Sequence, residues 1–251
     1  DRAHALREAL AVLRTPAGGW RETGEHPYQA NAHMHLLEAC MAWEAIEPER
    51  EWRGMADEIV SLARGAFIDA EGGFLREFFD AEWRPAAGDD GRLVEPGHQF
   101  EWAWLLARWG RLRDDAGAVN AAARLYEIGT RGVDERRGVA IDALNDDLSV
   151  RSDQARLWPQ TERLKAALIL AETAEGGRRT SLLDDARKAL AGLQRYLEPS
   201  GLWRDKMRMD ASFVDEPAPA SSFYHVMAAY EQLRATAAVL PELGWAAGDG
   251  S

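Results

Sequence analysis

The sequence is short of cysteine, of long apolar runs and of basic residues. Cys40 is the single cysteine among 251 residues, so no internal disulfide can form, and we expect a small buried side chain in a protein of the reducing cytoplasm. No apolar run reaches the roughly 18 residues that a membrane span requires, and the sequence shows no charged-then-apolar secretory start.

Acidic residues outnumber basic ones by 42 to 30, for a net charge of −12. We therefore expect neither nucleic acid nor a membrane as a partner, because both attract basic surfaces. A neutral small molecule fits better, and a homodimer is left open.

Apolar residues recur with helical spacing through most of the chain, and no long alternating pattern indicates strands. Eight helices are predicted, over residues 3–15, 30–47, 50–69, 97–112, 115–131, 157–175, 180–197 and 219–239. The protein is therefore predicted to be all-α. We expect a single domain over residues 1–240 and a flexible tail over 241–251, where small and polar residues predominate.

A repeated turn signal follows every second helix. It consists of glycine and an apolar residue, in Gly18-Gly19-Trp20, Gly72-Gly73-Phe74, Arg137-Gly138-Val139 and Gly201-Leu202-Trp203. The apolar markers that end these groups are 54, 65 and 64 residues apart. A period of this size, with two helices in each repeat, predicts stacked helical hairpins.

The two helices of each repeat differ in character. One set is amphipathic with a charged face, whereas the helices that begin near residues 30, 97, 157 and 219 carry unusual polar residues at their starts. In a closed ring of hairpins the second set forms the inner layer, and the starts of its helices open at one end. We expect the functional site at that end.

The start of the helix at 97 combines a histidine with a carboxylate. Pro96 and Gly97 signal the turn into the helix, and the residues from Phe100 onward are apolar nearly all round. His98 and Glu101 are three residues apart and share one face, so the Glu101 carboxylate can fix the imidazole tautomer and raise its basicity. Such a pair makes a general base, although a capped helix with a polar first turn gives the same pattern.

Comparable groups lie at the starts of the helices at 30 and 219. Asn31 and His35 are four residues apart and stack on one face, so they are candidate site residues, whereas His33 points elsewhere and is predicted to be structural. His225 lies in the first turns of an otherwise apolar helix.

The helix at 157 begins with a further polar group. Arg156 and Trp158 precede its proline, and either Gln160 or Glu162 is placed to point polar atoms into the mouth of the ring. Polarity in the first turn of a helix is also favoured by the helix dipole alone.

Three histidines at equivalent places on three inner helices point to proton transfer. Two imidazoles that face each other across a sugar-sized gap supply a base and an acid near neutral pH, as a racemase, epimerase or isomerase requires. A metal site is the competing interpretation, since His35, His98, Glu101 and His225 are competent ligands. A glycosidase could use Glu101 and Glu162, but its histidines would then be idle.

Four segments, in order along the chain, resemble the N-acylglucosamine 2-epimerase superfamily. They are Asn31 to Ala39, Glu95 to Trp102, Arg156 to Glu162 and Ser221 to His225. The resemblance implies an (α/α)6 barrel that transfers a proton at C2 of an opened monosaccharide through a cis-enediol, with neither metal nor cofactor. It implies that His98 and His225 are the acid/base pair and that Glu101 orients His98. It also implies that His35 and Asn31 contact O1 or O5 to assist ring opening, and that the pocket is shaped by Arg156, Trp158 and Glu162.

The chain departs from the family at its front. Six hairpins need twelve helices and eight are predicted, so the first two hairpins are expected to be missing from this chain, which we interpret as a fragment rather than as an incomplete, inactive barrel. We expect aldose–ketose isomerisation of the mannose type, with N-acyl-D-glucosamine 2-epimerisation as the alternative reaction. A non-catalytic sugar-binding or interaction protein on the same scaffold is the alternative of another class.

Overall fold

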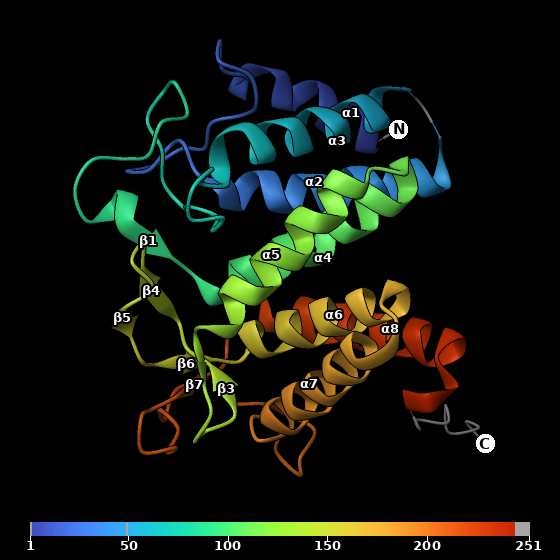
Figure 1. The fold of residues 1–251 in the computed structure, drawn as a ribbon. Helices are drawn as coiled ribbons and strands as arrows, with labels where there is room; N and C mark the ends of the chain where they lie inside the picture. The colour runs from blue at the N-terminus through green and yellow to red at the C-terminus, as the bar shows by residue number, and fades with distance from the viewer. Residues whose placement is uncertain (1, 49, 244–251) are drawn as a thin grey trace. The chain divides into compact units, whose positions relative to one another are not determined.

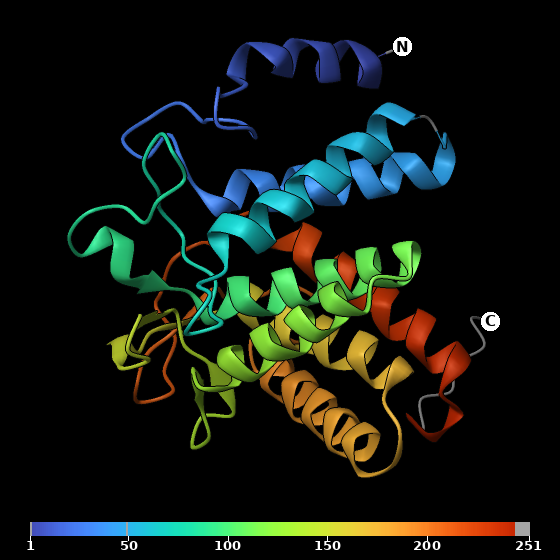
Figure 2. The same ribbon diagram turned by 45° about the horizontal axis from the view of Figure 1, so that its top comes forward.

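The first of two compact units covers residues 1–94. The structure, a computed structural model, describes residues 2–48 and 50–243 (Figure 1). The elements of the first unit are α1 (Arg2–Ala9), α2 (Ala30–Ile46), α3 (Arg50–Leu62) and β1 (Leu93–Val94). A 3-10 turn over Leu10–Leu13 follows α1, a π-helical turn over Ala63–Phe67 continues α3, and a 3-10 turn over Asp90–Arg92 precedes β1. Helices α2 and α3 pack against each other as a hairpin (Figure 2).

The second unit covers residues 95–251. Its helices are α4 (Pro96–Arg113), α5 (Ala116–Thr130), α6 (Trp158–Thr173), α7 (Gly176–Gln194) and α8 (Ser222–Val239). Its strands are β2 (Val133–Asp134), β3 (Val139–Ala140), β4 (Ala143–Asn145), β5 (Val150–Ser152), β6 (Ala155–Arg156) and β7 (Lys206–Met207). Antiparallel pairs join β2 with β3, β4 with β5, and β6 with β7.

The eight predicted helices are all present, and their ends differ from the predicted ones by a few residues. The short strands are too brief to give an alternating pattern in the sequence. Of the predicted flexible tail, Pro241–Leu243 form a 3-10 turn, and residues 244–251 lie outside the described residues. The single domain predicted over residues 1–240 stays a prediction.

The repeated glycine signals form the same local structure in both units. Gly18, Gly73, Gly138 and Gly201 have positive φ angles of 87°, 70°, 74° and 84°, a conformation that costs glycine little. Around them the backbone turns back on itself, with antiparallel bridges from Arg14 to Trp20, Ile68 to Leu75 and Leu197 to Trp203, and with the β2–β3 pair. The predicted repeat is thus confirmed as a tight hairpin after every second helix.

Helix α6 is the core of the second unit. It packs against α4, α7 and α8, and every residue from Pro159 to Ala171 is buried. Helix α5 covers α4 and α7 covers α6, so that α4 and α6 are enclosed as expected of inner helices (Figure 2). Helix α8 is less enclosed than its apolar sequence suggests, because Phe223, Met227 and Tyr230 are exposed.

His33 is a structural residue, as predicted. Its ring is fully buried; the Trp20 backbone N–H donates to Nε2 over 3.0 Å, and Nδ1 lies 3.0 Å from the Gln29 carbonyl oxygen. Because Nε2 accepts, the neutral ring carries its proton on Nδ1 and donates it to Gln29. A Cβ at Gly19 would lie 2.6 Å from Nε2, so glycine is required beside the ring.

Two further expectations concern single features of the chain. Cys40 is fully buried, and burial raises the pKa of its thiol to about 12, which fits a small apolar side chain rather than a nucleophile. Among the described helices, none has the length and apolar character that crossing a membrane would take.

His33 makes stability depend on pH. Burial lowers its pKa from 6.5 to about 4, so between these values the unfolded chain binds more protons, and the free energy of unfolding falls as pH falls. The slope due to this residue is at most about 1.4 kcal/mol per pH unit. Replacing His33 with Gln should remove that slope in denaturant titrations between pH 4 and 6.5. His26→Gln, at a half-buried histidine, is the matched control, and equal slopes in both variants would contradict the assignment.

Candidate active site

The starts of three helices meet within the second unit. Strands β3 to β7 lie at the end of the unit where α4 and α6 begin (Figure 1). The start of α8 joins them, because the His225 ring lies 5.6 Å from the Trp158 ring, measured between centroids. The sequence folds this way locally because Pro96 and Pro159 each occupy the first turn of their helix, where a missing N–H costs nothing.

His98 has a carboxylate partner at the start of α4. Its Nδ1 lies 3.4 Å from Oε2 of Glu95, and the two side chains are 13% and 20% exposed. A carboxylate at Nδ1 holds the proton there and leaves Nε2 as the basic atom. The predicted pairing of His98 with Glu101 stays a prediction, whereas Glu95 lies at ion-pair distance from His98.

His225 has a stronger partner in Glu162. Its Nδ1 lies 2.8 Å from Oε1 of Glu162, which is fully buried, while the imidazole is 14% exposed. Burial alone would lower the pKa of His225, but the hydrogen bond from Nδ1 to Glu162 and the negative charge of that carboxylate outweigh it and raise the pKa above its ordinary value. His225 is thus a stronger base than an ordinary histidine, and Nε2 is its ring nitrogen on the side away from the Glu162 contact.

Glu162 is ionised although no water reaches it. Burial tends to raise its pKa, but Lys165, whose Nζ lies 2.8 Å from Oε2, and His225 together hold the pKa below its usual range. Removing one partner of a buried charge pair leaves the other charge uncompensated, so Glu162 and Lys165 depend on each other.

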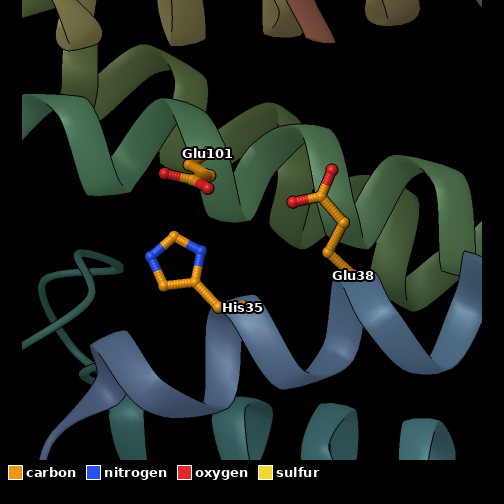
Figure 3. A group of neighbouring side chains, drawn as sticks. All are labelled: His35, Glu38 and Glu101. Atoms are coloured by element: carbon orange, nitrogen blue, oxygen red, sulfur yellow. The ribbon is translucent and has the colours of Figure 1, made fainter. Parts of the chain in front are cut away.

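Glu101, unlike Glu162, is protonated at neutral pH. Its side chain projects from α4 (Figure 3) and is fully buried. Burial first, and the nearby charge of Glu162 second, raise its pKa to about 8. Glu101 therefore carries a proton at neutral pH, as one member of two neighbouring carboxyl groups commonly does. A neutral carboxyl group supports the basicity of a histidine less than an ionised one.

Trp158 joins the two histidines. Its ring centroid lies 5.0 Å from that of His98 and 5.6 Å from that of His225. The guanidinium of Arg156 lies over the same indole, 5.3 Å from the ring centroid, and forms ion pairs with Asp142 at 3.0 Å and Glu95 at 3.7 Å. The structure thus brings His98, His225 and Arg156 together around the Trp158 ring, with Glu95 and Glu162 as the carboxylate partners of the two histidines.

Of the two polar residues proposed for the start of α6, only Glu162 belongs to this group. Gln160 is fully buried and clamps β3, because its side chain accepts from the Ala140 N–H at 2.7 Å and donates to the Ala140 carbonyl at 2.8 Å. Gln160 is therefore structural.

Asn31 and His35 belong to the first unit. Both lie on α2, and Figure 3 shows His35 and Glu38 projecting from the same face of this helix. The predicted role of Asn31 and His35 at the sugar oxygens stays a prediction.

Three side chains of the site are also of types that bind metals. Glu101, Glu162 and His225 offer ligand atoms that lie within 4.8 Å of one another. However, the Lys165 ammonium already provides a positive charge at Glu162, and Glu101 holds a proton. A divalent cation would have to displace both, so we expect no resident metal here.

Two partners of the candidate site residues are not singled out by the sequence patterns. Glu95 is three residues before His98, which is the spacing of neighbours on a helix. Lys165 is three residues after Glu162 within an apolar run. An opposite-charge pair inside a buried helix was the signal that could have revealed it.

Comparison with known proteins adds a family to this geometry. The family described as N-acylglucosamine 2-epimerase (GlcNAc 2-epimerase) matches residues 3–229. A protein of Rhizobium meliloti (strain 1021) named mannose-6-phosphate isomerase is 50% identical over 240 residues, which are 92% of this chain and 62% of that protein.

Solved structures give the fold. The structure of a D-mannose isomerase matches with a TM-score of 0.79 at 17% identity. The match covers 92% of this chain and 64% of that protein. The structure of a cellobiose 2-epimerase from Spirochaeta thermophila DSM 6192 matches with a TM-score of 0.80 at 20% identity. The match covers 94% of this chain and 64% of that protein. The predicted all-α fold of the (α/α)6 barrel class is confirmed. The chain spans less than two thirds of the length of each of these three relatives.

The protonation of Glu101 gives stability a second dependence on pH. Its pKa is raised from 4.5 to about 8 in the folded protein, so over this interval the folded state binds more protons and the free energy of unfolding falls as pH rises. The slope due to Glu101 is at most about 1.4 kcal/mol per pH unit. Glu101→Gln, which mimics the protonated acid, should remove this fall between pH 6 and 8 in denaturant titrations. Retention of the full wild-type slope in Glu101→Gln would mean that Glu101 is ionised throughout.

Gly97 makes room for Trp158. A Cβ at this position would lie 2.4 Å from the Trp158 ring, so Gly97→Ala should displace the indole and lower the free energy of unfolding by about 1 to 3 kcal/mol. Gly177→Ala is the matched control on α7, because nothing lies within 4 Å of a Cβ there, and it should leave stability equal or slightly higher. Thermal unfolding measures both, and equal melting temperatures would refute the packing argument.

Proposed function

Because the chain belongs to the N-acylglucosamine 2-epimerase family, we propose that it is a sugar isomerase or epimerase that moves a proton at C2 of an open-chain aldose. The observation that carries the proposal is the pair formed by His98 and His225, two imidazoles in contact with one indole, each with a carboxylate at Nδ1. Both imidazoles are partly exposed, whereas the supporting carboxylate of His225 is fully buried. Nε2 is the nitrogen of each ring that we propose to meet the substrate. A pair of bases with this support is what proton removal and proton return require.

The proposed reaction balances with two histidines alone. Nε2 of one histidine, in its neutral form, takes the proton from C2 of the aldose, and the other histidine, in its protonated form, gives its proton to the carbonyl oxygen O1, which yields a cis-enediol. Return of a proton to C1, with loss of the proton on O2, yields the ketose. Return of a proton to the opposite face of C2 by the other histidine, with loss of the proton on O1, yields the 2-epimer. The protein supplies position, charge and proton carriers.

Several other side chains have proposed roles around this pair. Trp158 offers a flat aromatic face on which a sugar can pack, and Arg156 is fixed over that ring by its ion pairs with Glu95 and Asp142. Glu101 is proposed to assist through the proton it holds at neutral pH. His35 and Asn31 are proposed, as in the family, to contact O1 or O5 during ring opening.

Mannose-type aldose–ketose isomerisation is the reaction we favour. The relative from Rhizobium meliloti that is 50% identical is named a mannose-6-phosphate isomerase, and a structural relative is named a D-mannose isomerase. We therefore propose mannose or its 6-phosphate as substrate, with N-acyl-D-glucosamine 2-epimerisation as the alternative.

The proposal predicts exchange of the C2 hydrogen with solvent. The full-length protein is mixed in deuterated water with mannose, mannose 6-phosphate, fructose, glucose or N-acetylmannosamine. Each sugar is tested with and without a chelator, and the hydrogen at C2 is followed by NMR. We expect exchange in a mannose sugar together with the matching ketose. His225→Ala should lower the rate by at least about 100-fold with the fold intact, because general acid–base catalysis contributes 10² to 10⁴. His4→Ala is the control.

The outcomes separate the classes of function. No exchange in any sugar would refute the enzyme and leave a binding protein on the same scaffold. Unchanged turnover in His225→Ala would refute the assigned role of this histidine. Loss of turnover on chelation would instead establish a metal site.

A further inference from the structure

Lys165 is a buried charge for which the proposed reaction has given no role. Its side chain is fully buried on α6, in a helix whose other residues between Pro159 and Ala171 are also buried. Removing an ammonium from water is costly, and an apolar side chain of similar length would fill the same space without that cost. A lysine kept at such a position calls for a function of its charge.

The ammonium is held at the meeting point of three helices. Nζ lies 2.8 Å from Oε2 of Glu162 on α6 and 3.8 Å from the centroid of the Trp104 ring on α4. The Trp104 indole is fixed in turn, because its Nε1 donates to Oε1 of Gln232 on α8 over 2.7 Å. Contact with an aromatic face and an ion pair together compensate part of the desolvation.

Lys165 and His225 use different oxygens of the same carboxylate. Oε1 of Glu162 accepts from Nδ1 of His225 at 2.8 Å, while Oε2 faces Lys165. The three side chains thus form a continuous chain from a fully buried cation to a partly exposed base. A change in the charge at Lys165 therefore alters the protonation of Glu162 and, through Glu162, the position of the proton on the His225 ring.

A second carboxyl group makes the charge of Lys165 decisive. Glu101 offers a ligand atom within 4.8 Å of those of Glu162 and His225, and it is equally buried. Two adjacent buried carboxyl groups do not both ionise, so one keeps a proton. Lys165 makes its close contact with Glu162, which directs the proton to Glu101.

We propose that Lys165 is a positioning residue for the acid/base pair: its ammonium keeps Glu162 ionised, so that Glu162 holds the proton of His225 on Nδ1 and presents Nε2 to the substrate. The inference rests on the proposed function for its catalytic meaning. The charge arrangement that it describes exists without any sugar.

The first test uses nitrogen NMR on His225 in the full-length protein without sugar. In the wild type the neutral ring should carry its proton on Nδ1. In Lys165→Met, which keeps the length of the side chain but loses its charge, a large share of the neutral ring should carry the proton on Nε2, because a protonated Glu162 becomes a donor. Lys188→Met, at an exposed lysine on α7, is the matched control and should match the wild type.

The second test uses kinetics on the sugar that exchanges. Lys165→Met should lower kcat about 10-fold or more with KM within about threefold of the wild type, and Glu162→Gln should do the same. Because both act through one chain, the double variant should be no slower than the slower single variant. Effects on kcat that multiply in the double variant would overturn the proposal.

The outcomes remain decisive if a variant fails. Where Lys165→Met does not fold, Lys165→Gln replaces it, since the amide can donate to Glu162 but carries no charge. An unchanged His225 tautomer in a folded Lys165 variant overturns the inference. A protein that turns over no sugar refutes the proposed function alone, and the tautomer measurement still decides the role of Lys165.

Discussion

The site depends on one buried carboxylate. Glu162 has no exposure to solvent, yet it remains ionised because Lys165 faces one of its oxygens and His225 donates to the other. In the low-dielectric interior each of these contacts is strong, and loss of either would leave a charge without compensation. The carboxylate therefore fixes three things at once: the charge of Lys165, the proton of Glu101 and the basic nitrogen of His225.

The architecture supplies this arrangement through the packing of α6. The first turns of α6 carry Trp158, Glu162 and Lys165. The neighbouring helix α4 contributes Glu101 and Trp104, and α8 contributes His225. His98 receives a weaker version of the same support from Glu95, at 3.4 Å rather than 2.8 Å. Two histidines on one indole, each with a carboxylate at Nδ1, suit the proposed reaction, in which one removes a proton and the other returns it.

The helices, the repeat and the histidines of the proposed acid/base pair could be found from the sequence. Apolar periodicity and glycine placement depend on local geometry, so the eight helices and the four tight turns could be predicted, and the polar starts of apolar helices marked His98, Glu162 and His225. Partner choice could not be predicted, because it depends on distances between helices. Thus the sequence did not single out Glu95, which lies at ion-pair distance from His98, or Lys165, which stands in the apolar run of a core helix. The enclosure of α8 was also overestimated, since apolar composition does not say what covers a helix.

The central claim is that His98 and His225 address C2 of an open-chain sugar through their Nε2 atoms. A crystal structure of the full-length protein with mannitol, an open-chain polyol that cannot react, tests this most directly. The account predicts that C2 lies between the two imidazoles, with each Nε2 nearer to the sugar than the corresponding Nδ1 and with the chain of the sugar along Trp158. A polyol bound in contact with neither histidine, or with both imidazoles on one side of C2, would contradict it.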